Sequence, residues 1–98
     1  SPSIVAVACW ISYIEQQYHQ ALETCDEALE MDSGLSTAYF WQGQTLEKLD
    51  RPAAAVDAYR KALALSPDSV EVTTSLGHAL GKSGDKTGAE EVMAQLSN

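Results

Sequence analysis

The chain repeats itself with a period of about 34 residues, and this period restricts its possible folds more than any other feature of the sequence. Gly43 and Gly77 are separated by one such period. The same spacing relates three alanines: Ala21, Ala55 and Ala89. A period of this length, with small residues at fixed places, is typical of pairs of helices that stack into a solenoid. We therefore predict an all-α solenoid of three antiparallel helix-pair units. The units are residues 2–35, 36–69 and 70–98.

Residues that start and end helices stand where such units need them. Pro52 suits the first turn of a helix, where its missing N–H leaves no hydrogen bond unmade. Gly84 suits the left-handed backbone at a helix end, and Ser69 can cap the helix that follows it. Together with the spacing of apolar side chains, these signals predict two helices in each unit. The first helices are residues 3–15, 36–48 and 70–82, and the second helices are residues 18–31, 53–65 and 86–97.

The chain is acidic, with a net charge of −8 over 98 residues. Nucleic-acid binding requires Lys and Arg to neutralise phosphates, so this charge argues against a nucleic-acid partner. No run approaches about 18 apolar residues, so membrane insertion is not expected. Residues 1–35 hold six acidic residues and no Lys or Arg. A solvated helix face explains this excess, and a basic partner is the alternative.

Two cysteines are too few for a disulfide scaffold. Cys9 and Cys25 precede Gly43 and Tyr59 by one repeat period, so they occupy packing positions on the facing sides of two paired helices. We favour buried free thiols, and with them a cytoplasmic location. The alternative is a disulfide, which needs an oxidising compartment.

Residues 36–69 carry a recurrent set of side chains: Tyr39, Gly43, Leu46, Ala55, Tyr59, Ala62 and Pro67. On these residues the unit resembles a tetratricopeptide repeat (TPR). Gln42 and Leu46 depart from the family pattern, which has leucine and an aromatic residue at these places. Residues 70–98 are similar to a truncated repeat, and residues 2–35 are the weakest match. The resemblance implies a right-handed solenoid whose first helices line a concave, peptide-binding groove.

The stretch from Tyr39 to Leu96 is also similar to repeat arrays attached to bacterial signalling proteins, such as winged-helix regulators, Ser/Thr kinases and nucleotide cyclases. We therefore expect a fragment of a larger bacterial protein. The function that the resemblance implies is a non-catalytic scaffold for protein–protein interactions.

Four large aromatic side chains lie off the helix faces that the repeat pattern needs for its core: Trp10, Tyr13, Phe40 and Trp41. Aromatic side chains off the core are the usual anchors of a binding surface. We predict that these four line the groove and bind a peptide or protein segment. The polar contacts are expected from Gln44, His78 and Lys82. The alternative is that neighbouring repeats or a flanking segment cover these rings.

One variant of the family binds carboxyl-terminal peptides with a clamp of Lys, Arg and Asn. The matching places in this chain hold none of these residue types: Ala6, Trp10, Trp41, Glu71 and Ser75. We therefore expect an apolar or aromatic partner rather than an acidic carboxyl terminus.

The first helix suggests a second function, because its apolar residues surround it almost completely. Terminal repeats normally present a polar outer face, so a preceding repeat or a second copy of the chain is expected to cover this one. Self-association as a homodimer is therefore the alternative function. The residues expected at that contact are Ile4, Val7, Trp10, Ile11 and Ile14.

Enzyme chemistry has little support in the sequence. No glycine-rich phosphate loop is present, and His19 lies between Cys9 and Cys25 without a recognised metal-ligand spacing. His78 near Lys82 is best explained as a solvated histidine. We expect no catalytic residue, no metal and no cofactor.

Overall fold

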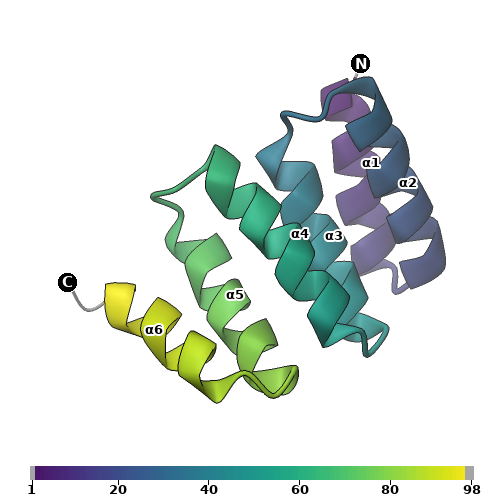
Figure 1. Cartoon of the computed structure of the whole chain (residues 1–98). Coiled ribbons are helices and arrows are strands. Elements are labelled where there is room, and N and C mark those ends of the chain that lie inside the picture. Colours follow the sequence, from purple (N-terminus) through teal and green to yellow (C-terminus); the bar gives the residue numbers. More distant parts are fainter. Residues whose placement is uncertain (1, 97–98) are drawn as a thin grey trace.

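The computed structural model describes the backbone of residues 2–96 and the side chains of residues 4–96. It contains six helices joined by short turns (Figure 1). The helices are α1 (Pro2–Ile14), α2 (Tyr18–Met31), α3 (Ser36–Lys48), α4 (Pro52–Leu65), α5 (Val70–Lys82) and α6 (Lys86–Leu96). Each helix packs antiparallel to the next, and the pairs stack into a layer measuring 37 × 25 × 18 Å. The predicted all-α helical repeat is therefore confirmed.

The helix ends agree with the predicted ones to within one residue. α1 begins and ends one residue earlier than predicted, and α4 includes Pro52 in its first turn. Ser69 caps α5, since its Oγ accepts a hydrogen bond from the N–H of Val72 at 3.2 Å. The predicted end of the last helix at residue 97 lies outside the described residues.

The same turn joins the two helices of every pair. Gln16, Asp50 and Gly84, which occupy the same place in successive units, have positive φ angles of 63°, 58° and 95°. Behind each of them the backbone makes the two hydrogen bonds of a Schellman motif; in the second unit these run from Asp50 N–H to Glu47 O and from Arg51 N–H to Leu46 O. Gly84 therefore correctly predicted the turn at the end of α5, whereas the other two turns use residues for which this conformation is unfavourable.

The core of the second unit is built where a glycine faces a tyrosine. Tyr59 of α4 is fully buried, and a Cβ atom added to Gly43 of α3 would lie 2.5 Å from its ring. Only a residue without a side chain leaves room for that ring. In the third unit, Gly77 meets Met93 in the same way. Small residues thus recur at a fixed spacing in the sequence because the close contacts between paired helices recur at that spacing.

The first unit makes the equivalent contact with two cysteines. Cys9 of α1 and Cys25 of α2 are both fully buried, and the structure joins them in a disulfide. Their Cα atoms are 5.2 Å apart, which lies within the usual range for disulfides. The prediction of free thiols is therefore wrong. The reason is that the small residues at this position bring the two helices close enough for a bond.

Candidate functional site

Helices α1, α3 and α5 form the inner face of the layer. α3 contacts both α1 and α5, whereas α2 does not contact α4, and α4 does not contact α6, within the part of the chain that the structure describes. The inner helices therefore lie closer together than the outer ones. The stack curves for this reason, with its concave side on α1, α3 and α5.

The four predicted aromatic anchors lie together on this concave side, with Trp41 at their centre. The ring centroid of Trp41 lies 6.2 Å from that of Trp10, 5.2 Å from that of Tyr13 and 5.0 Å from that of Phe40. The tilted and edge-on geometries of these pairs are favourable for aromatic rings. Residues from α1 and α3 thus build one continuous aromatic surface.

Phe40 differs from the other three rings. It packs against the buried core of α4 and α5, and its ring centroid is 6.1 Å from that of Tyr59. The expectation that all four rings lie off the core is therefore wrong for Phe40. The other rings are half-buried or exposed, and Trp10 is the most open of them at 41% exposure.

An apolar hollow of about 340 Å³ lies between α1 and α3. The two tryptophans form its main walls. The lining residues are Ala6, Val7, Trp10, Leu35, Thr37 and Trp41. A solvent-facing hollow of this size with mainly apolar walls is suited to a large apolar side chain of a ligand. We call it the apolar hollow.

A second hollow of about 360 Å³, the polar hollow, lies between α3 and α5. All three predicted polar contacts line it: Gln44, His78 and Lys82. The other lining residues are Tyr13, Glu47, Lys48, Thr74 and Ser75. Apart from Phe40, the predicted groove residues thus gather in two adjoining parts of one groove, which Tyr13 and Trp41 join.

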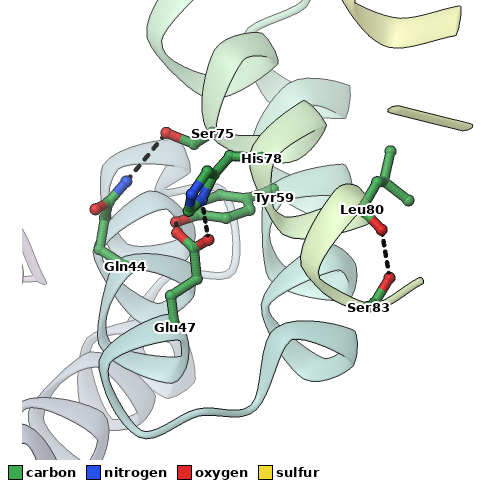
Figure 2. Close-up of polar contacts among 7 residues, drawn as sticks. All are labelled: Gln44, Glu47, Tyr59, Ser75, His78, Leu80 and Ser83. Atoms are coloured by element: carbon green, nitrogen blue, oxygen red, sulfur yellow. Dashed lines mark hydrogen bonds and ion pairs between the residues drawn. The ribbon is translucent and has the colours of Figure 1, made fainter. Parts of the chain in front are cut away.

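Glu47 organises the polar hollow, and the predicted site did not include it. Tyr59 Oη donates a hydrogen bond to Glu47 Oε2 at 2.6 Å, and His78 Nδ1 lies 2.8 Å from Glu47 Oε1 (Figure 2). A parallel contact runs from Gln44 Nε2 to Ser75 Oγ at 3.0 Å. One carboxylate therefore ties α3 to both α4 and α5. A buried tyrosine needs a partner for its hydroxyl, and that need is the only signal of this role in the sequence.

The ionisation of Tyr59 reflects these surroundings. Burial raises the pKa of the Tyr59 phenol, and the hydrogen bond to the Glu47 carboxylate raises it further. The phenol is therefore neutral and acts as the donor in this pair. Its role is structural, since the ring is fully buried in the core.

The five apolar side chains of α1 that are expected at a self-association contact are open to solvent. Ile4 is 71% exposed, and the other members of the set are between two-fifths and three-fifths exposed. Val7 and Trp10 face the apolar hollow, whereas Ile4, Ile11 and Ile14 are not among its lining residues. α1 therefore presents two apolar surfaces, one inside the groove and one outside it.

Two other kinds of site find no support in the described part of the chain. Among residues 2–96, no helix has the length and apolarity needed to cross a lipid bilayer. No group of three or more His, Cys, Asp or Glu side chains in that range is placed to hold a metal ion.

Stacked helix pairs with a groove on their inner helices define an α-solenoid repeat protein. The chain belongs to the tetratricopeptide repeat family, whose sequence model matches residues 15–70. The predicted family is therefore confirmed. The chain is 35% identical over 81 residues to tetratricopeptide repeat protein 28 of Mus musculus, covering 83% of this chain and 3% of that protein. It is 30% identical over 81 residues to the probable biofilm formation methyltransferase WspC of Pseudomonas aeruginosa, covering 83% of this chain and 19% of that protein.

Solved structures share the fold. The crystal structure of MamA protein superposes with a TM-score of 0.91 at 17% identity, over 96% of this chain and 51% of that chain. MamA AMB-1 superposes with a TM-score of 0.88 at 20% identity, over 97% of this chain and 56% of that chain. Identity this low is evidence for the fold alone. The chain spans about half the length of these structures and a small part of the length of the curated relatives. Its repeat fold is that of a protein-interaction scaffold.

Proposed function

We propose that this TPR segment is a non-catalytic interaction module that binds a peptide or protein segment in its concave groove. The observation that carries the proposal is the pair formed by Trp10 and Trp41, whose rings pack with centroids 6.2 Å apart and both line the solvent-open apolar hollow. Tryptophans at the centre of a concave surface are the strongest class of binding anchors. The three helix-pair units, residues 2–35, 36–69 and 70–98, act as one domain in this proposal.

The partner in this proposal is an apolar or aromatic segment. The apolar hollow offers tryptophan, valine and leucine side chains, which gain most from burying another apolar side chain. A cytoplasmic location remains part of the proposal, but the Cys9–Cys25 disulfide counts against it, because disulfides persist mainly in oxidising compartments.

The test is to select peptides from a displayed library of random dodecapeptides and to titrate the best of them against three proteins. Trp10→Ala should weaken binding by about 2 kcal/mol, or roughly 30-fold, because it removes one wall of the apolar hollow. Met31→Ala, which removes a similarly exposed apolar side chain from α2, is the control and should bind like the wild type. Equal affinity in all three proteins, or no selected peptide at all, would contradict the proposal.

Self-association through α1 is the second candidate function. It is favoured by the exposure of Ile4, Ile11 and Ile14 on a helix that contacts just α2 and α3 among the helices that the structure describes. Light scattering across a concentration series should then give twice the chain mass of 10.5 kDa. Ile4→Ser combined with Ile11→Ser should restore the mass of a single chain while leaving peptide binding unchanged, since neither residue lines the apolar hollow. A single-chain mass for the wild type at high concentration would end this second proposal.

A further inference from the structure

The polar hollow collects positive charge in a chain that is otherwise acidic. The whole sequence has 6 Lys and Arg residues against 14 Asp and Glu residues, yet Lys48 and Lys82 both line this one hollow. They occupy the same position in consecutive repeats. Both lie in the last turn of their helices, where a cation is favourable near the helix dipole. That position explains why a lysine is favourable in each helix, but it does not supply either lysine with a carboxylate partner.

The one acidic side chain of the polar hollow is already engaged. Glu47 is 12% exposed, and its two oxygens contact Tyr59 Oη and His78 Nδ1. Apart from that contact with His78, no basic and acidic side chains lie within 4.0 Å of each other among the described residues, so neither lysine has a carboxylate within that distance. The two ammonium groups are exposed and the nearby carboxylate is not available to them. With two lysines against one carboxylate, the side chains that line the hollow therefore carry a net positive charge.

The hollow also offers a neutral hydrogen-bond donor beside these cations, the side-chain amide of Gln44. His78 does not add a second one, because a neutral imidazole that donates its Nδ1–H to the Glu47 carboxylate leaves Nε2 as an acceptor. Gln44 uses one amide N–H for Ser75 Oγ, and a glutamine amide has two. Ammonium and amide donors on one concave surface match the acceptor oxygens of a carboxylate.

From these contacts we infer that the polar hollow binds one Asp or Glu side chain of the ligand, next to the large apolar side chain held in the apolar hollow. This inference rests on the proposed function and specifies its ligand. Tyr13 lines the polar hollow and packs 5.2 Å from Trp41, which lines the apolar hollow, so a short segment reaches both. The contact uses Lys48 and Lys82, which are not the places of the family's carboxyl-terminal clamp.

Charge elsewhere limits the ligand to a single carboxylate. Glu71 lines the hollow that adjoins Phe40 and Trp41 on the other side of the groove. A second acidic residue placed there would meet a like charge, and the net charge of −8 would repel a strongly acidic segment at long range. The ligand class is therefore a mainly apolar segment with one acidic residue.

The experiment compares peptides selected by three proteins from the same displayed library of random dodecapeptides. Lys48→Gln combined with Lys82→Gln removes the two cations of the polar hollow. Arg60→Gln combined with Lys86→Gln removes the same charge from residues that do not line it. The wild type and the control should select peptides that combine Trp, Phe or Leu with Asp or Glu. The first double variant should keep the apolar preference and lose the acidic one.

A selected peptide with an amidated carboxyl terminus then gives the affinity test. Replacing its Glu by Gln should weaken binding to the wild type by about fivefold to tenfold, as expected for an exposed charge contact with added hydrogen bonds. The same replacement in the peptide should not change its affinity for the double variant that carries Lys48→Gln and Lys82→Gln. Dependence on a free carboxyl terminus instead of the side chain would overturn the inference.

The outcomes separate the two proposals. Selection of apolar peptides without any acidic preference overturns this inference and leaves the proposed function standing. An acidic preference that survives in the lysine variant places the carboxylate elsewhere and also overturns it. Failure of the wild type to select any peptide overturns the proposed function itself. Far-ultraviolet circular dichroism of each variant checks that the fold is kept, which is expected because the four substituted residues are exposed.

Discussion

The glycine at the α3–α4 contact offers the sharpest test of how this fold is held together. In Gly43→Ala the new Cβ atom would lie 2.5 to 2.8 Å from three ring carbons of Tyr59. Real Cβ atoms essentially never approach other atoms so closely, so one of the two residues must move. Tyr59 has little freedom to do so, because its ring is fully buried and its hydroxyl is bonded to Glu47.

The expected loss of stability follows from three contributions. Overpacking a buried site costs about 1–3 kcal/mol. Displacing the Tyr59 ring also weakens its hydrogen bond to a charged acceptor, a contact that contributes about 1.5–3 kcal/mol. The higher helix propensity of alanine offsets about 1 kcal/mol of this loss. Because the hydrogen bond is stretched rather than fully lost, we expect the free energy of unfolding to fall by about 2–3 kcal/mol.

Two other glycines provide graded controls within α5. A Cβ atom at Gly81 would have no neighbour within 4 Å, so Gly81→Ala should stabilise the protein by about 0.5–1 kcal/mol. At Gly77 the nearest atom is Sδ of Met93, 2.7 Å away, at the far end of a flexible side chain that is 43% exposed. Since Met93 can rotate away, Gly77→Ala should change stability by less than about 1 kcal/mol.

Urea unfolding followed by circular dichroism in the far ultraviolet measures all three variants against the wild type. The midpoints should rank Gly81→Ala above Gly77→Ala, and Gly77→Ala well above Gly43→Ala. For a domain of this size, the expected loss for Gly43→Ala also corresponds to a fall in melting temperature of roughly 8–20 °C. If Gly43→Ala proved as stable as Gly81→Ala, the argument that this contact requires a missing side chain would be refuted.

Three further predictions concern the other contacts that join the helices of each pair. Tyr59→Phe should lower the free energy of unfolding by about 1.5 kcal/mol at pH 7, because Glu47 loses its hydrogen-bond donor. The pKa of Tyr59 is raised in the folded state, so its contribution to stability is complete only below the ordinary tyrosine pKa of about 10. In urea titrations the difference between the two proteins should therefore shrink as the pH rises beyond that value. Reduction with dithiothreitol should lower stability by about 2–3 kcal/mol, as expected for a bond that closes a short loop, and a variant with alanine in place of Cys9 and Cys25 should not respond. Gln16→Gly should raise the melting temperature, because glycine adopts the positive φ of 63° without the cost of about 1 kcal/mol that a side chain brings. A lower melting temperature for this variant would refute the turn assignment.

Most of the fold was predictable because the repeat pattern depends on residue size as well as on hydrophobicity. The regular spacing of Gly43 and Gly77 predicted the helix pairs, and Pro52 and Ser69 predicted helix starts. Turns that lack a glycine were harder to recognise. The positive φ at Gln16 and Asp50 follows from the helix pairing around them, which overrides the local preference of each residue.

The candidate site was predictable in its members but not in its internal contacts. Spacing alone was enough to put Trp10, Tyr13 and Trp41 on the inner helices, and the structure places the rings of Trp10 and Tyr13 within 6.2 Å of that of Trp41. The part played by Glu47 depends on Tyr59, 12 residues away on another helix, and on His78, 31 residues away. Such contacts are set by how two and three helices pack together, which no periodicity within one helix describes.

The two halves of the groove differ because the three helix pairs are held together in different ways. In the second pair, the buried Tyr59 reaches through the core to Glu47 and thereby orders the polar hollow from beneath. In the first pair, the Cys9–Cys25 bond occupies the equivalent place and offers no polar atom to the groove, and Ala6, Val7 and Trp10 make the inner face beside it mainly apolar. Trp10 directly follows Cys9 on α1, and the contact that anchors α1 to α2 therefore also sets the position of one wall of the apolar hollow. A change at one core position of the repeat thus alters both the stability of a helix pair and the chemistry that the groove presents at that pair.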